Sequence, residues 1–309
     1  MATSTITDPA TLIELNRILA SGHLPALPQS AIRLLELAKD AKNGPGEFAQ
    51  PIEADPGLMG QVLKFVNSSY FGFSREISSV KHATTMVGIR TVKNFVLWSA
   101  VFSLMPNPKC GVFNLSNLWQ DSLRRALFVR LFCKLMGQRD AEDAFVGALL
   151  QDMALPLLVK EYGDRYQKLF AQRNQGAVRL SDLEQAEFGW THAAVGGMMA
   201  RKWNLPESAA QLIERHVDPD ILAAGQGSSP AELAVSLSAL FPAVNDGSWV
   251  DCRLFSDWFQ HLCPSGSSGV CEVLSQVDHE FMEFAPVLKV AAPPKTLVES
   301  HREALGLLA

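Results

Sequence analysis

The stretch FVGALLQDMALPLL, residues 145–158, decides the fold. Its apolar residues recur at intervals of three and four and continue around the helix cylinder, which is typical of a helix buried on nearly every face. The one polar step in this central helix is Gln151-Asp152. Burying an unpaired carboxylate costs several kcal/mol, so we expect Asp152 to be paired, hydrogen-bonded or on a cavity wall. A hydrogen-bonded core aspartate without further function fits the same pattern.

Composition limits the classes of function. The chain has 309 residues, of which 48% are hydrophobic, so it is long enough for one large domain or two ordinary ones. Its 27 Lys and Arg residues are outnumbered by 32 Asp and Glu residues, which gives a net charge of −5. This balance argues against nucleic-acid binding driven by phosphate neutralisation. No apolar run has the length of a membrane span and no secretory signal pattern opens the chain, so we expect a cytoplasmic protein without a membrane partner.

The cysteines are odd in number, scattered and without a C-x-x-C pair, as expected for reduced thiols. Cys263, Cys271 and His279 follow one another at intervals of eight residues, which leaves a zinc site as an alternative. Structural zinc sites usually show tighter paired spacing, so we expect no zinc site here. The five cysteines are Cys110, Cys133, Cys252, Cys263 and Cys271.

Almost no segment alternates with a period of two, so the sequence predicts an all-α protein. Asp55-Pro56 and Ser79 predict helix starts, Gly88 predicts a helix end, and Ser181-x-x-Glu184 predicts a capping box. The aromatic loop 67–74 is expected to anchor on the core, with ligand stacking as the alternative. The main predicted helices cover residues 8–21, 29–38, 57–66, 80–87, 90–104, 118–136, 142–159, 162–174, 183–188, 192–203, 207–216, 231–240, 249–263 and 270–287.

Three stretches together resemble the HDOD family, the HD-related output domains of bacterial signalling. The first joins LPALPQSAIRLLELAKD (24–40) to the segment 52–97, and the second is FVGALLQDMALPLLVKEY (145–162). The third is E-x-x-x-F-G-W-T-H-A-A-V-G-G (184–197) with WNLPESAAQLIERH (203–216). The resemblance implies a multi-helix HD-like bundle. It covers about residues 23–220 and suggests an HDOD domain there, with subdomains 23–106 and 112–220. The helix patterns outside it predict an N-terminal helix in 1–22 and a C-terminal helical extension in 228–309.

The HDOD family resembles the HD metal-dependent phosphohydrolases, in which histidines and carboxylates hold divalent ions that activate water. The ligand pattern of those enzymes consists of a His on an early helix, a His-Asp pair, later histidines and a final Asp. At the matching positions this sequence has Asp121 for the early His, Gln151-Asp152 for the His-Asp pair, and Ser238 or Ala239 for the final Asp. Only Asp152, His192 and His216 keep the ligand type of those enzymes.

A glutamine amide is a weak metal ligand, so we expect neither a metal nor another cofactor in this protein. His192 and His216 would then be core or cleft histidines that hydrogen-bond with Asp152. If a divalent metal does bind, the resemblance implies Asp121, Asp152, His192 and His216 as its ligands.

The leading hypothesis is a non-catalytic signalling module that binds a protein partner or a small ligand. The resemblance suggests a two-component or cyclic-dinucleotide pathway. The ligand-cleft candidates are Gln151, Asp152, His192, His216, Asp121 and Arg124. The alternative is a metal-dependent phosphohydrolase acting on a nucleotide or phosphodiester, in which Arg124 and Arg125 would contact phosphate.

Overall fold

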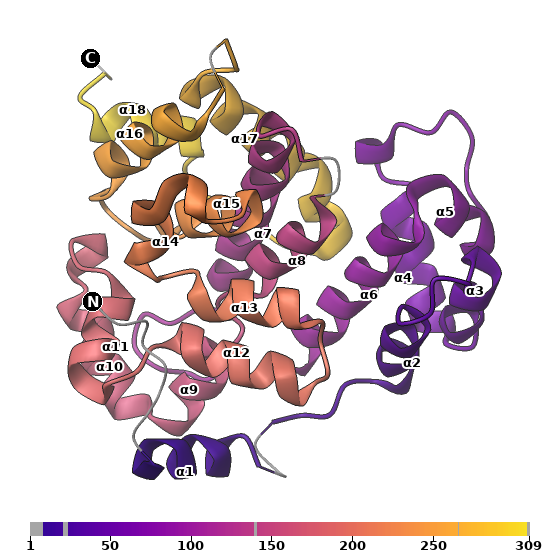
Figure 1. The fold of residues 1–309 in the computed structure, drawn as a ribbon, viewed down its shortest axis with the longest axis horizontal. Helices are drawn as coiled ribbons and strands as arrows, with labels where there is room; N and C mark the ends of the chain where they lie inside the picture. Colours follow the sequence, from indigo (N-terminus) through magenta and orange to yellow (C-terminus); the bar gives the residue numbers. More distant parts are fainter. Residues whose placement is uncertain (1–8, 21–23, 139–140, 265, 308–309) are drawn as a thin grey trace. The chain divides into compact units, whose positions relative to one another are not determined.

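The structure is a computed structural model that describes residues 9–20, 24–138, 141–264 and 266–307. In these ranges the chain forms α-helices and short 3-10 helices, without a strand (Figure 1). The predicted all-α fold is confirmed. Contacts within the chain group the helices into two compact units, here called unit 1 and unit 2.

Unit 2 consists of residues 26–104 and 280–291. Helix starts in it follow the sequence predictions: the Asp55 carboxylate accepts hydrogen bonds from the backbone N–H groups of Gly57 and Leu58, and Ser79 accepts one from His82. Gly88 ends a helix with a φ of 92°, which L-residues rarely adopt. The elements are α2 (Gln29–Leu37), α3 (Pro45–Glu53), α4 (Pro56–Val66), η1 (Ser69–Phe71), α5 (Val80–Val87) and α6 (Ile89–Leu104).

The aromatic loop of unit 2 is anchored as its composition predicts. Phe71 packs edge-on against Phe65, with ring centroids 5.1 Å apart, and Tyr70 packs against Phe284 at 4.1 Å. Asn67 fixes the base of the loop because its side-chain amide exchanges two hydrogen bonds with the backbone of Ile77, of 2.8 and 2.7 Å. These contacts make the aromatic side chains part of the packing of unit 2.

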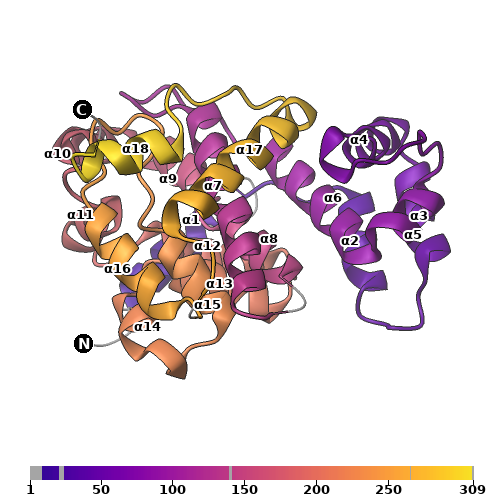
Figure 2. The same cartoon turned by 90° about the horizontal axis from the view of Figure 1, so that it is seen from above.

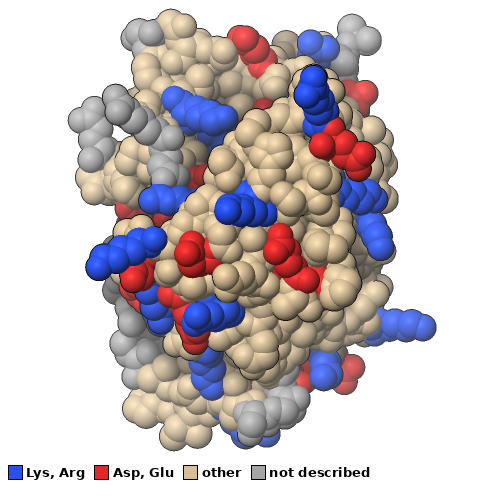
Figure 3. Space-filling view, turned by 90° about the vertical axis from the view of Figure 1, so that its right-hand side faces the viewer, with Lys and Arg blue, Asp and Glu red and all other residues tan. Residues whose placement is uncertain are grey.

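Charged residues of both signs lie on the surface, and some polar residues of the helices are buried. Positive and negative side chains are interspersed among uncharged residues on the face shown in Figure 3. Lys93 and Asn94, the polar residues at the start of α6, are buried, so this helix does not present them as a DNA-recognition helix would. Among the helices of the described ranges, none combines the length and apolar character needed to cross a membrane.

Unit 1 consists of residues 1–25, 105–279 and 292–309. This grouping differs from the ranges suggested by the family resemblance, which stay predictions. Helix α17 (Val270–Leu288) has residues in both units. The other elements of unit 1 are α1 (Pro9–Ile18), α7 (Leu115–Leu135), α8 (Glu142–Leu150), α9 (Leu155–Glu161), α10 (Gly163–Gln172), η2 (Asn174–Gly176), α11 (Leu180–Phe188), α12 (His192–Lys202), α13 (Glu207–Arg215), α14 (Pro219–Ala224), η3 (Gly225–Gly227), α15 (Pro230–Ser238), α16 (Cys252–Leu262) and α18 (Leu297–Ala304).

The first helix is attached to unit 1 by polar contacts. The Tyr162 hydroxyl donates to a Glu14 carboxylate oxygen at 2.7 Å, and Lys202 donates to the carbonyl of Leu19 at 2.9 Å. The predicted start of this helix at Asp8 and its end at Gly22 lie outside the described residues.

An aromatic cluster connects α7 to residues that follow the predicted HDOD domain 23–220. Measured between ring centroids, Phe128 of α7 lies 5.5 Å from Phe255 and 6.4 Å from Phe259 of α16. Phe132 lies 5.5 Å from Phe259, and Phe241 lies 5.0 Å from Phe128. Because aromatic side chains bury large areas, residues beyond 228 share the hydrophobic core of unit 1.

The predicted helix over 142–159 is wrong in one respect, because the structure divides it into α8 and α9. Residues 151–154 form turns in which Met153 N–H donates to Leu150 O and Leu155 N–H donates to Asp152 O, each at 3.0 Å. Pro156 explains the break, since proline lacks an N–H and its ring clashes with the carbonyl four residues earlier. The polar step Gln151-Asp152 therefore lies at a helix break.

Two glycines allow α12 and α8 to pack closely against α13. Helices α12 and α13 lie side by side in both views (Figures 1 and 2). A Cβ atom on Gly196 would lie 2.8 Å from Cγ2 of Ile213, and one on Gly147 of α8 would lie 2.9 Å from Cβ of Leu212. Both distances are shorter than van der Waals contact allows, so this helix packing requires glycine.

Replacing Gly196 by Ala should destabilise the protein by about 1–3 kcal/mol, because the new methyl group overlaps the stiff, buried Ile213 side chain. Gly60→Ala in α4 is the matched control. Nothing lies within 4 Å of its added Cβ, so this variant should gain about 0.5–1 kcal/mol. Urea unfolding of both variants checks the prediction, and a Gly196→Ala protein as stable as the wild type would contradict it.

Candidate functional site

Three polar side chains meet in unit 1: Asp152, His192 and His216. Asp152 lies in the turn between α8 and α9, His192 is the first residue of α12, and His216 directly follows α13. All three are buried. The structure thus brings together three of the candidate residues that the sequence places far apart along the chain.

Their facing atoms form a nearly equilateral triangle. Nε2 of His192 lies 3.2 Å from Oδ1 of Asp152 and 3.2 Å from Nε2 of His216, and the third side, from His216 to Asp152, is 3.4 Å. Ligand atoms bound about 2.1 Å from a single ion lie roughly 3.0–3.4 Å from one another. The triangle therefore has the dimensions of one face of a metal-coordination sphere.

Oxygen acceptors fix the outer nitrogens of both imidazoles. Nδ1 of His192 lies 2.6 Å from Oε2 of Glu184, and Nδ1 of His216 lies 2.7 Å from the carbonyl oxygen of Ile213. Because both partners are acceptors, both Nδ1 atoms carry their proton and the two Nε2 atoms face Asp152.

Glu184 is a site residue that the sequence prediction assigned wrongly. Its side chain is fully buried; Oε1 accepts from the Tyr166 hydroxyl and Oε2 accepts from the backbone N–H of His192, both at 2.8 Å. The predicted capping box with Ser181 does not form, because α11 begins earlier and Arg179 is its N-cap residue. The sequence does contain a signal for a role of Glu184 in the site, because Glu184 is the first residue of the stretch E-x-x-x-F-G-W-T-H that ends at His192.

Arg125 of α7 donates a hydrogen bond to Oδ2 of Asp152. Only 12% of the Arg125 side chain and 6% of the Asp152 side chain are exposed, so this ion pair is shielded from water. Burial alone would raise the pKa of Asp152, but Arg125 and the two histidines hold it well below the ordinary carboxyl value.

The charges of this cluster balance one another. Burial would lower the pKa of His192, but Glu184 and Asp152 together raise it to about 10, so the ring is an imidazolium at neutral pH. Burial lowers the pKa of His216, which is therefore neutral. Two carboxylates, Asp152 and Glu184, thus face two cations, Arg125 and His192.

Asp121 lies near the cluster but is not part of the group that could hold one ion. Its Oδ1 accepts from the backbone N–H of Val244 at 2.9 Å. Burial raises its pKa to about 6, against the opposing effect of Arg125 and Arg124. Asp121 therefore lines the cavity without completing a four-residue ligand set.

Two of the cleft candidates from the sequence do not line the cavity. Gln151 is fully buried, and neither polar atom of its side-chain amide has a hydrogen-bond partner among the described residues. Arg124 is 3% exposed and lies in the charged environment of Asp121 and Asp278. Arg125, one residue further along α7, points into the cavity instead.

The position expected for the final aspartate of the HD pattern carries no ligand. Ser238 is buried and donates its hydroxyl proton to the carbonyl of Val235 at 2.7 Å. Ala239 lines the cavity and offers only a methyl group. No carboxylate replaces the missing ligand at either of these two positions.

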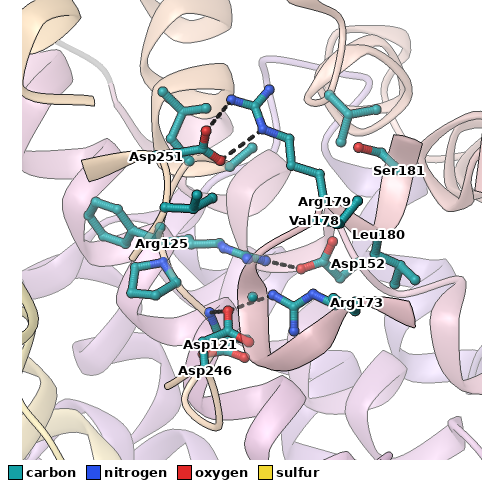
Figure 4. A pocket seen from close by; sticks show the side chains of 18 of the residues that line it. Asp121, Arg125, Asp152, Arg173, Val178, Arg179, Leu180, Ser181, Asp246 and Asp251 are labelled. Carbon is teal, nitrogen blue, oxygen red and sulfur yellow. Dashed lines mark hydrogen bonds and ion pairs between the residues drawn. The ribbon is translucent and has the colours of Figure 1, made fainter. Parts of the chain in front are cut away.

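The cluster lies in a cavity of about 210 Å³. Three arginine–aspartate pairs line this cavity. In Figure 4, Arg125 extends toward Asp152 from one side, and Arg173 and Arg179 extend toward Asp246 and Asp251 from the opposite side. Arg173 bonds Asp246 at 2.6 Å. Arg173 and Arg179 are not among the candidates from the sequence, where they are ordinary basic residues of a helix end and a loop.

The third pair joins Arg179 and Asp251. Arg179 donates from Nε and Nη2 to the two oxygens of Asp251, at 2.8 and 2.7 Å, which is a bidentate arrangement. Beside it, the large apolar residues Val112, Val178 and Val250 line the cavity while remaining exposed. The cavity therefore combines an apolar rim with paired charges, as small-molecule sites commonly do.

A family model for the HDOD domain matches residues 24–219, which is most of the chain. The chain belongs to the HDOD family. A protein without an assigned function from Treponema pallidum is 25% identical to this HDOD chain over 197 residues. That alignment covers 62% of this chain and 37% of the relative, so this chain corresponds to well under half of the relative's length.

Solved structures share the fold. An HDOD domain protein of unknown function from Geobacter sulfurreducens has a TM-score of 0.68 at 21% identity, covering 91% of this chain and 98% of its own. A protein named as a candidate signal transduction protein from Marinobacter aquaeolei has a TM-score of 0.67 at 18% identity, covering 91% and 65%. A protein named as a candidate phosphohydrolase from Shewanella amazonensis has a TM-score of 0.63 at 18% identity, covering 96% and 99%.

Proposed function

We propose that this HDOD chain is a non-catalytic signal-transduction module that binds a protein partner or a small ligand at the cavity around Asp152. The ion pair between Arg125 and Asp152 carries the proposal. In the HD enzymes that the family resembles, the matching aspartate holds a metal ion. Here a guanidinium already neutralises it, and a metal would have to compete with that buried cation.

The remaining positions of the HD pattern support the same proposal. Gln151 offers an amide in place of an imidazole, and Ser238 and Ala239 offer no carboxylate. Asp121 is held by a backbone N–H and does not join the three-residue group. A pair of catalytic ions normally needs more ligands than Asp152, His192 and His216 supply.

The cavity supports a binding role because it has apolar walls and three ion pairs that can reorganise around a charged ligand. Family membership is what suggests a two-component or cyclic-dinucleotide pathway. Because the net charge is −5 and no helix of the described ranges is long and apolar enough to cross a membrane, the proposed partner is a signalling protein or a small ligand rather than nucleic acid or a membrane.

Metal analysis combined with phosphatase assays tests the proposal. We expect the purified chain to contain far less than one transition-metal ion per molecule, because Arg125 and His192 already neutralise the cluster. We also expect no hydrolysis of p-nitrophenyl phosphate or bis(p-nitrophenyl) phosphate when Mn²⁺ or Fe²⁺ is added. Inductively coupled plasma mass spectrometry and absorbance at the nitrophenolate band are the measurements.

The control for these measurements is a pair of isosteric variants in the same cavity. Asp152→Asn removes the carboxylate at the centre of the cluster, and Asp251→Asn removes one that pairs with Arg179. The non-catalytic proposal would be contradicted if the wild type bound one metal ion per molecule or hydrolysed either substrate, and if Asp152→Asn lost this property while Asp251→Asn kept it.

The second candidate function is a metal-dependent phosphohydrolase, and the triangle of donor atoms favours it. Asp152, His192 and His216 have the spacing of ligands on a single ion. They would hold that ion once His192 lost its inner proton, while Glu184 would orient the His192 ring. A bound divalent ion activates water and neutralises phosphoryl charge. The same metal and hydrolysis measurements distinguish this candidate from the first.

A further inference from the structure

A second cluster of reactive side chains lies in unit 1, on the C-terminal helices. Cys271 is in the first turn of α17, His301 is in α18 and Ser256 is in α16. The sulfur of Cys271 lies 3.7 Å from Nδ1 of His301, and the Ser256 oxygen lies 3.0 Å from Nε2 of the same ring. One buried imidazole therefore bridges a thiol and a hydroxyl.

The hydrogen bonds determine which nitrogen of His301 carries the proton. The Ser256 hydroxyl donates its single proton to the carbonyl of Cys252 at 2.9 Å, so its oxygen accepts from Nε2–H of His301. Nδ1 then has a free lone pair, and this lone pair faces the thiol of Cys271. His301 is consequently placed to accept the thiol proton, as the base does in Cys-His nucleophile pairs.

The surroundings hold this arrangement in place. His301 is 4% exposed, and Trp249 packs edge-on against its ring with centroids 5.8 Å apart. Burial lowers the pKa of His301, so the ring is neutral and can act as a base at neutral pH. Cys271 is half-buried, so it is accessible to small reagents, and it lies in the first turn of α17.

The other described thiols lack these features. Cys110 and Cys133 are buried, and burial raises the pKa of Cys133 to about 12. Cys252 is also buried, with its pKa raised to about 11. Cys263 is half-buried like Cys271, but burial raises its pKa to about 11, and none of the histidines in the described ranges is hydrogen-bonded to it.

We propose that Cys271 is an activated thiol that reacts with small electrophiles and hydroperoxides, with His301 as its base and Ser256 as the residue that positions the base. With a hydroperoxide, the Cys271 sulfur attacks the terminal peroxide oxygen and the O–O bond breaks. The thiol becomes a sulfenic acid and the hydroperoxide is reduced to the alcohol, or to water in the case of hydrogen peroxide. His301 takes the thiol proton and passes it to the departing oxygen.

Competitive alkylation tests the proposal. The full chain is treated with limiting iodoacetamide at pH 7 and the modified peptides are quantified by mass spectrometry. We expect Cys271 to react at least about tenfold faster than Cys263, because a neighbouring base increases the thiolate fraction. After brief exposure to hydrogen peroxide, we expect dimedone to label Cys271 and not Cys263.

Three variants show whether the reactivity of Cys271 comes from activation by His301 or only from its exposure to solvent. His301→Gln should reduce the alkylation rate of Cys271 to about that of Cys263, and Ser256→Ala should reduce it in the same direction. Ser256→Ala removes a single oxygen, so it keeps the test valid if His301→Gln does not fold. His261→Gln is the control, because His261 is an exposed histidine of α16 packed on Trp258 and should leave the rate unchanged. The proposal fails if Cys271 reacts no faster than Cys263, or if neither His301→Gln nor Ser256→Ala slows it.

Discussion

Replacing Arg125 by Gln should lower the free energy of unfolding by about 3–5 kcal/mol, because it leaves the buried charge of Asp152 without its guanidinium partner. The double variant with Asp152→Asn should recover most of this loss, since both charges are then absent. Urea unfolding of the two single variants and the double variant measures the coupling between the residues.

A surface ion pair provides the control for this experiment. Arg165 bonds Glu187 at 2.8 Å, but both side chains are more than 40% exposed. Exposed pairs contribute less than about 1 kcal/mol, so Arg165→Gln should be nearly neutral. Equal losses for Arg125→Gln and Arg165→Gln would show that the Arg125 pair has no special structural role.

The Arg125→Gln variant also tests why the cluster is expected to lack a metal. Without the guanidinium, Asp152 keeps its charge and faces two imidazoles at 3.2 and 3.4 Å. Zn²⁺ or Mn²⁺ should then bind and raise the melting temperature of the variant, whereas the wild type should not respond. Equal stabilisation of both proteins would contradict the view that Arg125 takes the place of the metal charge.

The sequence predicted the helical fold and the central residues of the cluster because both have local signatures. Apolar periodicity identifies helices, and the family pattern marks Asp152, His192 and His216. The break at residues 151–154 was missed because the apolar pattern continues across it, although Pro156 signals a new helix start.

The remaining site residues depend on tertiary packing, which periodicity does not encode. Arg124 and Arg125 are neighbours in sequence, yet Arg125 pairs with Asp152 in the cavity, whereas Arg124 does not line it. Adjacent residues on a helix point about 100° apart, so the rotation of α7 decides which one lines the cavity. That rotation is set by the aromatic core around Phe128, whose partners in α16 lie more than 100 residues away.

Replacing Glu184 by Ala should destabilise the protein by about 3 kcal/mol or more, because three buried donors lose their acceptor at once. These donors are the Tyr166 hydroxyl, the backbone N–H of His192 and its Nδ1–H. Glu187→Ala in the same helix is the control and should change stability by less than about 1 kcal/mol, since Glu187 is largely exposed.

A double-mutant cycle with Tyr166→Phe shows whether Glu184 acts through these hydrogen bonds. In the wild type, Tyr166→Phe removes a buried hydroxyl that donates to the Glu184 side chain, and this should destabilise the protein by about 1.5–3 kcal/mol. In the Glu184→Ala background the hydroxyl has already lost its acceptor, so its removal should be neutral or slightly stabilising. Chemical denaturation measures all four proteins. Additive effects would mean that Glu184 stabilises the site by its volume alone, whereas strong coupling would identify it as the acceptor that orients Tyr166 and His192.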